Sequence, residues 1–534
     1  MQQFIEKYRD QITGVLNGFD RLIFRAAPRR LNFGYFDRNL KAFVAQGMEE
    51  YCWQNKLLFK NYAEHVKTVS ERLKKESLQP FRQQDLPVIF LQSPSVDKDA
   101  LARTVAENRN IQSGLVCAIS ALEPSPTFDH KGMHLVRRVR PCHVLYHYQI
   151  HPEVGWMHAR IQTWFPFNIQ IGLNGREWLA RQMDTEKLKY IQQANCFPWI
   201  EDFERAQQLM NRQLQTNWTG LLQGFAQQLN PLHDAIFERY PTSYYWTCFQ
   251  SEWATDIVFR EAEALKRLMS IVVPHAVCSF SCTDVLRYFN KHVNKSGEIP
   301  ANFNGTVEIN LKQYQEGQRV KFALNGNSAK AYDKAYTVFG NVFRANETTI
   351  NNVKGFKEYR TKEGKPDGPK EWKGLRKGTA GIFRRVEISQ QANERAIHAL
   401  ASIDDSRRVE ELTAAIQRRV RWNGRSVRAL RPWAEDKELL QAVTHGDFQI
   451  QGLRNRDLQA LLYGTPAETA RDKRRRSAAV SRKLRMLRAH GIIKKVPRTH
   501  RYLVTDAGLP IIIAVLTTAR TSVNQLNRLE SKAA

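Results

Sequence analysis

Residues 142–167 show the alternation of hydrophobic and polar side chains that is typical of two β-strands. The stretch CHVLYHYQIHPEVGWMHARIQTWFPF is rich in β-branched and aromatic residues, which suit a pleated sheet. A Pro-Glu-Val-Gly turn at residues 152–155 would join the strands into a hairpin. The cross-strand pairs expected from this turn are His151–Trp156, Gln149–His158 and His147–Arg160. The polar residues of both strands would then share one face.

A face of this composition suits nucleic acid. Arg160 carries the positive charge that phosphates require, and Trp156 and Trp164 supply rings on which bases stack. The alternative is a solvated face, or a contact surface beneath the N-terminal helices.

The same face predicts a metal site. His147 and Gln149 lie two residues apart on one strand face, with His158 across the ladder, and these side chains would hold a divalent ion such as Mg²⁺ or Mn²⁺. His143, His147 and His151 do not form such a site as a group, because four residues of extended chain span about 13 Å.

Several other segments carry apolar residues at spacings of three or four, which predicts helices. The first 80 residues, residues 97–108, a helix that begins over 176–183, and most of the chain from there to about 267 are expected to be helical. In the last of these, Glu252 and Asp256 would share a helix face, as a metal site or as an ordinary charged surface. Residues 86–92, residues 114–122 and the two segments around Glu316 and Gly317 are predicted strands.

The C-terminal segment carries the clearest pattern. Residues 454–462 and 471–490 are predicted helices, the second ending at Gly491, and two short strands follow. Val480, Leu484 and Leu487 form the apolar stripe of the second helix. The basic residues of this helix that we expect to contact nucleic acid are Arg474, Arg475, Arg476, Arg482, Lys483, Arg485 and Arg488.

This layout and the string LRAHGIIKKVPRTHRY resemble the MarR-like winged helix-turn-helix domains over roughly the last 90 residues. The resemblance implies that the basic helix enters a DNA major groove. It also implies that Arg498 and His500, in the wing, contact the backbone or the minor groove. The helix from Leu509 onward is a candidate surface for packing on this domain or for a homodimer.

The charge of the whole chain indicates that the C-terminal segment is not the only part that contacts an anionic partner. The 534-residue chain has a net charge of +28, which indicates a polyanionic partner. Nucleic acid is the first candidate, with DNA ahead of RNA. A membrane surface ranks lower, because no polybasic run adjoins a long apolar segment and Pro510–Leu516 is too short to span a bilayer.

Cysteine usage indicates a reducing cytoplasm. The seven cysteines are odd in number and include no C-x-x-C pair, so neither a disulfide framework nor a zinc finger is predicted. The N-terminus also lacks the basic-then-apolar layout of a signal peptide.

Residues 330–347 suggest chemistry on phosphodiesters. Tyr332 and Tyr336 are four residues apart, with Lys330 and Lys334 beside them. Together with His147-Tyr148-Gln149, this segment (KAYDK…FRANE) is similar to the rolling-circle and plasmid replication initiators of the HUH class. The resemblance implies that His147 and Gln149 hold a metal ion and that Tyr332 or Tyr336 attacks the scissile phosphate. In this sequence glutamine replaces the second metal histidine of that class.

A metal-dependent nuclease that uses carboxylates is the other enzymatic option. Its candidate residues are Glu123, Glu252, Asp256, Glu308 and Glu347. For Glu347, an ion pair with Arg344 is the alternative that needs no ligand. No phosphate-binding loop, dinucleotide fingerprint, serine-hydrolase elbow or zinc-protease motif occurs, which argues against a nucleotide-driven motor or a common hydrolase.

These patterns together predict a multidomain α+β protein with a central mixed sheet that contains a helical insertion. The expected parts are a helical region (1–80), a mixed α/β region (81–185), the helical insertion (186–274), a β-rich region (275–360), a basic linker and helix (361–435) and a winged helix (436–534). We expect a nucleic-acid-binding protein that processes DNA for a mobile element, as an initiator, nickase or nuclease, with RNA as a further partner. The alternative is a non-catalytic binder, either a transcription regulator or the protein component of a ribonucleoprotein.

Overall fold

The computed structural model describes most of the chain. The described residues are 1–32, 45–93, 95–268, 307–314, 317–324, 327–333, 340–354, 356–362, 367–401, 408–443, 453–465, 467–496, 499–505 and 507–519. Tyr336, Lys334 and Arg498 lie outside them.

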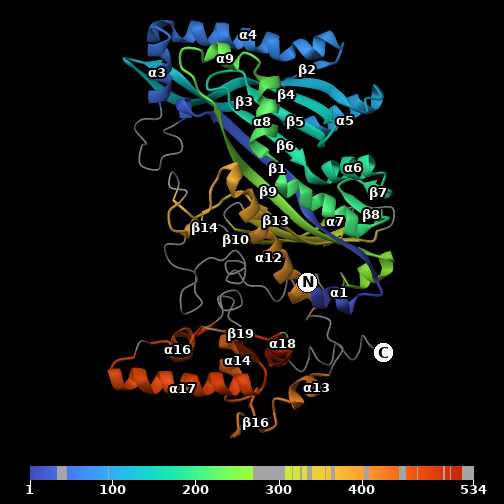
Figure 1. The fold of residues 1–534 in the computed structure, drawn as a ribbon, viewed down its shortest axis with the longest axis vertical. Coiled ribbons are helices and arrows are strands. Elements are labelled where there is room, and N and C mark those ends of the chain that lie inside the picture. The colour runs from blue at the N-terminus through green and yellow to red at the C-terminus, as the bar shows by residue number, and fades with distance from the viewer. Residues whose placement is uncertain are drawn as a thin grey trace.

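A large central sheet organises the molecule (Figure 1), and the protein is of the mixed α+β class. The described strands of this sheet follow the order β10-β11-β12-β13-β9-β1-β6-β5-β4-β3-β2. Their bounds are β1 Ile12–Pro28, β2 Val88–Leu91, β3 Gly114–Lys131, β4 His134–His151, β5 Gly155–Gln162, β6 Ile169–Asn174, β9 Tyr244–Phe259, β10 Val307–Tyr314, β11 Gly317–Leu324, β12 Asn327–Asp333 and β13 Val342–Ile350. Neighbouring strands are antiparallel, except that β2 runs parallel to β3.

Two segments predicted to be helical are strands at the centre of this sheet. β1 replaces part of the expected N-terminal helix, and β9 replaces the helix expected over residues 244–260. The two strands pair with each other along most of their length. Both are rich in β-branched and aromatic residues, which favour strands. Each is hydrogen-bonded to a strand on both sides, and this pairing stabilises the extended conformation.

The predicted β4–β5 hairpin is present, but its predicted register is wrong by one residue. His151 pairs with Gly155, so the loop is 152–154, and the buried Val154 belongs to the loop. His147 therefore lies opposite Ala159. Because side chains alternate along a strand, this slip places the polar residues of the two strands on opposite faces.

Helices cover both faces of the sheet. α3 (Gln46–Gln54), α4 (Tyr62–Gln83) and α8 (Trp218–Leu229) bury the largest apolar cluster, and α5 (Lys98–Asn108) packs on β3 over a second cluster. α6 (Gly175–Glu186), α7 (Phe203–Arg212) and the hairpin of β7 (Tyr190–Gln193) and β8 (Cys196–Ile200) cover part of β1. α12 (Ile382–Ala401) packs on β9 and β13. The helices predicted over 97–108 and from 176 are confirmed as α5 and α6.

The C-terminal part has an apolar core of its own, built from residues between Ile416 and Val515. Its described elements are α13 (Val409–Ala414), β16 (Val420–Trp422), β17 (Arg425–Val427), α14 (Lys437–Val443), α16 (Asn455–Tyr463), α17 (Ala470–Ala489), β18 (Ile493–Lys495), β19 (Tyr502–Val504) and α18 (Gly508–Thr518). The predicted order of helix, basic helix and two short strands is confirmed. No described helix is long and apolar enough to cross a membrane.

Candidate functional site

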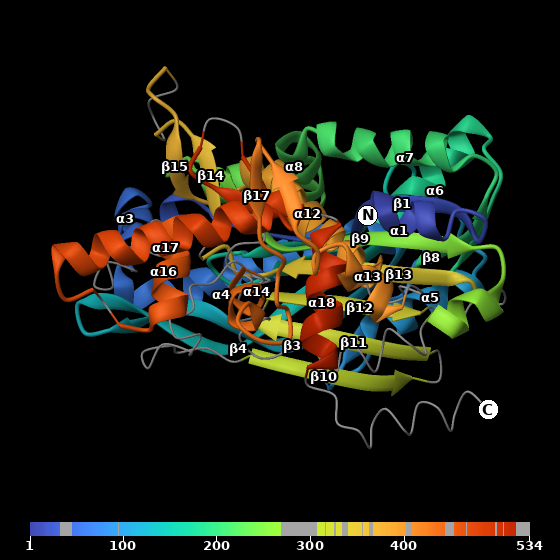
Figure 2. The same ribbon diagram turned by 90° about the horizontal axis from the view of Figure 1, so that it is seen from below.

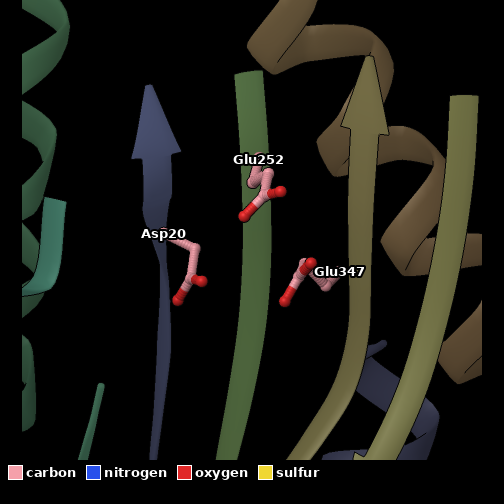
Figure 3. A group of neighbouring side chains, drawn as sticks. All are labelled: Asp20, Glu252 and Glu347. Carbon is pink, nitrogen blue, oxygen red and sulfur yellow. The ribbon is translucent and has the colours of Figure 1, made fainter. Parts of the chain in front are cut away.

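Three carboxylates from three neighbouring strands meet on one face of the central sheet. Asp20 lies on β1, Glu252 on β9 and Glu347 on β13, as Figure 3 shows. One oxygen of each carboxylate lies within 4.8 Å of the other two. Asp20 and Glu347 are buried, whereas Glu252 is partly exposed and gives solvent access to the cluster.

Two β-bulges help to bring these side chains together. On β1, Phe19 pairs with Trp253 and Arg21 with Glu252, so Asp20 is the extra residue between them. On β13, the register shifts between Arg344 and Asn346. A bulge turns a side chain out of the regular alternation, and bulges are frequent beside functional sites.

Two cations contact two of the three acids, Asp20 and Glu347. Arg344 pairs with Asp20, and it lies 3.0 Å from Glu347 (Nη1 to Oε2) and 2.7 Å from Asp256 (Nε to Oδ1). Lys330 Nζ lies 2.7 Å from Glu347 Oε1. The ion pair predicted between Arg344 and Glu347 is therefore confirmed.

The fully buried Arg176 of α6 adds a further cation beside the cluster. Its Nη2 lies 3.1 Å from Asp256 Oδ2, but none of its side-chain nitrogens forms a hydrogen bond with a described residue. Its Nε also lies 3.9 Å from Asp20 Oδ1, so Arg176 is a buried cation that is ion-paired with both acids without forming a regular hydrogen bond to either.

The two glutamates have opposite pKa shifts. Burial and the nearby charges of Glu347 and Asp20 raise the pKa of Glu252 to about 7. Burial would also raise the pKa of Glu347, but Arg344 and Lys330 outweigh it and lower that pKa to about 2. Near neutral pH, Glu252 is therefore the glutamate of the cluster that gains or loses a proton, whereas Glu347 stays ionised.

Carboxylate oxygens are the ligands that Mg²⁺ and Mn²⁺ prefer, so the set Asp20, Glu252 and Glu347 fits such an ion. The cation would take the place of the proton on Glu252. The same contacts also support a structural role, as an ion-pair network that joins β1, β9 and β13.

The predicted metal ligands on the β4–β5 hairpin do not converge. His147 Nε2 lies 3.1 Å from Ser77 Oγ of α4, and Gln149 donates to the sulfur of Met157. His158 lies on the opposite face beside Tyr148. Burial lowers the pKa of His147 to about 3 and that of His158 to about 4. The one-residue slip of the hairpin places His158 on the face opposite His147 and Gln149.

The predicted nucleic-acid face of the hairpin is mostly covered. Trp156 is 8% exposed and donates to Asp99 of α5. Arg160 is paired with Glu123, at 3.0 Å from Nη2 to Oε2. Trp164 follows β5 and is half-buried against the main core. These side chains hold elements together instead of forming one open surface.

The segment predicted to carry catalytic tyrosines adjoins the carboxylate cluster. Lys330 and Glu347 belong to the cluster, and Tyr332 on β12 takes the register position opposite Arg344. Of the five carboxylates proposed for a nuclease, the structure brings Glu252 and Glu347 together in the carboxylate cluster. Asp256 instead pairs with Arg344 and Arg176. Glu123 pairs elsewhere with Arg160.

Asp20 and Arg176 were not predicted from the sequence. The available signal for Asp20 was a single acid inside the apolar stretch VLNGFDRLIF, which an N-terminal strand would have made conspicuous. For Arg176, the signal was its position two residues after Asn174, whose side chain caps α6.

Comparisons with protein-family models, with curated proteins and with solved structures found no match.

Proposed function

We propose that the protein binds nucleic acid through its C-terminal part, with α17 as the recognition helix of a winged helix-turn-helix. The observation that carries this proposal is an exposed stripe of arginines on α17, on the side opposite the apolar stripe that packs into the C-terminal core. The stripe consists of Arg471, Arg474, Arg475, Arg482 and Arg485, all exposed. Their spacing places them along one side of the helix.

Most of these arginines are free to meet an anion. Arg475 pairs with Asp472 at 2.8 Å, whereas Arg474, Arg482 and Arg485 form no ion pair with a described residue. The apolar side of α17, at Val480, is fully buried. A soluble helix gains no folding energy from such a stripe, because like charges repel, so a polyanionic partner is its simplest explanation.

Three other basic residues of α17 pack against their neighbours or are partly buried. Arg476 Nε lies 2.7 Å from Asp472, and the Arg488 guanidinium lies 4.9 Å from the ring centre of Trp422. Lys483 is half-buried. We therefore assign binding to the exposed stripe and to His500, which is exposed in the turn between β18 and β19.

The test compares two triple variants of the full chain. R474A/R482A/R485A removes three charges from α17. K67A/R72A/K75A removes three exposed charges from α4, which lies near the other end of the molecule (Figure 1). We expect the α17 variant to weaken binding of duplex DNA by about tenfold or more and the α4 variant to change it far less. Equal losses would contradict a specific role for α17.

DNA is the proposed main ligand, and a ribonucleoprotein component is the alternative. RNA that copurifies with the chain, detected as ultraviolet absorbance that ribonuclease removes, would favour the alternative. A preference for RNA duplex over DNA duplex in the same titration would favour it as well.

We propose metal-dependent phosphodiester chemistry at the carboxylate cluster as a second function. The specific observation is the convergence of three carboxylate oxygens, with Lys330 and Arg176 beside them. A divalent ion at this position would supply Lewis-acid activation of a phosphate or a bound water. Lys330, which is partly exposed and contacts Glu347, would stabilise negative charge on phosphate oxygens. Tyr332 remains the proposed nucleophile of the phosphotyrosine route.

Mn²⁺ titration by calorimetry tests this second function, with E252Q as the variant and E71Q on α4 as its control. Glu252 is the ligand to replace, because it is partly exposed and has no ion-pair partner among the described residues. E252Q should lose Mn²⁺ binding and Mn²⁺-dependent DNA cleavage, and E71Q should keep both. If the wild type does not bind Mn²⁺, the metal proposal is wrong and the cluster has only a structural role. Cleavage that survives Y332F would remove Tyr332 from the mechanism.

A further inference from the structure

The hairpin of β14 (Lys357–Arg360) and β15 (Glu371–Gly374) carries exposed aromatic side chains. It projects from the body of the molecule, as Figure 2 shows. Tyr359 is 56% exposed and Trp372 is 60% exposed, and Phe383 at the start of α12 is also 60% exposed. A hollow of about 540 Å³ is lined by these three rings and by Glu358, Ala380, Arg384 and Glu387. We call it the hairpin groove.

The rings of the hairpin groove are held in place. Tyr359 and Trp372 are direct cross-strand partners, with ring centres 5.5 Å apart and ring planes inclined by 50°. Arg384 lies 5.7 Å from the centre of the Trp372 ring, and it is fixed by hydrogen bonds to the Lys357 carbonyl and to Glu387. The groove therefore presents a preformed aromatic wall with a guanidinium beside it.

The charge around the hairpin groove favours an anionic partner. Three glutamates at or beside the groove are already neutralised: Glu358 pairs with Arg376, Glu371 with Lys373, and Glu387 with Arg384. Four exposed lysines form no ion pair with a described residue. They are Lys357, Lys362, Lys370 and Lys377.

We propose that the hairpin groove binds an unpaired base of a single-stranded nucleic acid, with Trp372 as the main stacking platform. Exposed aromatic rings among unpaired basic residues are the combination by which proteins hold single strands without reading their sequence. The lysines contact the phosphates on either side of the stacked base. This inference extends the proposed nucleic-acid binding to a second surface, separate from α17, and to unpaired strands.

A purely apolar peptide is a poorer match for the hairpin groove. Its wall is aromatic, but Glu358, Arg384 and Glu387 contribute polar groups to its lining, and lysines surround it. Burying that lining against an apolar surface would desolvate charges without compensation, whereas phosphates and base edges can use them.

The test uses the full-length chain and fluorescein-labelled oligomers of deoxythymidine and of uridine, whose binding is followed by anisotropy. W372A should raise the Kd by about fivefold to 100-fold, the range expected for loss of one stacked base, and Y359A should raise it less. W372F keeps an aromatic ring and should retain most of the affinity. Trp53→Ala is the matched control, because Trp53 is 82% exposed on α3 and lies outside the groove.

Tryptophan fluorescence supplies a readout that a structural role would not change. Stacking of a base on Trp372 should quench part of the protein's emission, and this part should be missing in W372A. Equal Kd values and equal quenching for W372A and the wild type, with both oligomers, would overturn the proposal. A difference seen with only one oligomer supports it and shows which of the two strands the groove prefers.

Duplex DNA distinguishes failure of this proposal from failure of the α17 proposal. We expect W372A to leave duplex affinity unchanged and R474A/R482A/R485A to lower it. Duplex binding without oligomer binding would overturn only the hairpin-groove proposal. Oligomer binding that depends on Trp372, without duplex binding, would support the groove and remove α17 as a duplex-binding helix.

Discussion

The carboxylate cluster and the exposed stripe of α17 both depend on arginine, but the surroundings give this residue opposite roles. In the cluster, Arg344 is fully buried and contacts three acids on three strands. On α17, Arg482 is exposed and has no ion-pair partner among the described residues. Buried arginine is held by its partners and contributes to the fold, whereas exposed arginine without a partner is available for binding.

The largest expected effect is on the cluster. R344A would leave Asp20, Asp256 and Glu347 buried without their shared cation. Breaking a buried ion pair in this way costs about 3–5 kcal/mol, so we expect the free energy of unfolding in denaturant to fall by that amount. R474A is the matched change on α17 and should alter stability by no more than about 0.5 kcal/mol. Equal losses of stability in the two variants would contradict the different roles of the buried and the exposed arginine.

The next effect concerns the proton on Glu252, whose pKa is raised to about 7. Below the unfolded pKa of about 4.5, both states hold the proton and no penalty arises. As pH rises toward 7, the unfolded state releases the proton before the folded state does, so stability is lost. E252Q avoids this loss and should be about 1–3 kcal/mol more stable than the wild type at pH 8 in the presence of a chelator.

The E252Q advantage should shrink as the pH is lowered to about 5, and denaturant unfolding at both pH values measures it. E71Q, an exposed change on α4, should show no such pH-dependent gain. A variant E252Q that is less stable than the wild type at pH 8 would mean that Glu252 is ionised and paired in the folded protein.

A smaller effect distinguishes the two sides of α17. The Arg488 guanidinium lies over Trp422 and, at 6.0 Å, over Tyr502, so it packs the helix onto its neighbours. R488A should lower unfolding stability by about 1 kcal/mol and change duplex affinity less than R482A does. The opposite order, with stability unchanged and affinity lost, would place Arg488 in the binding surface.

The C-terminal elements could be predicted from the sequence because their signals are local. Thr469 caps the start of α17, Gly491 with a φ of 71° follows its end, and the apolar spacing between them is regular. The β4–β5 hairpin was predicted for the same reason. Its register was not, because the burial of Val154 shortens the loop by one residue, which no local pattern shows.

The carboxylate cluster could be predicted only in part. Glu252 and Glu347 were candidates, but the cluster also requires Asp20, which is more than two hundred residues away in sequence. Its strand, β1, has an apolar spacing that fits a helix as well as a strand. The pairing of β1 with β6 and β9 decides its conformation, and this pairing is a property of the whole fold.

The dependence of duplex affinity on salt tests whether the exposed stripe of α17 contacts phosphates. Each phosphate contact contributes a slope of about −0.9 to the plot of log affinity against log salt concentration. We therefore predict that R474A/R482A/R485A reduces the magnitude of the wild-type slope by about three and that K67A/R72A/K75A leaves it nearly unchanged. A slope that is the same for the wild type and the α17 variant would show that the exposed stripe does not contact phosphates.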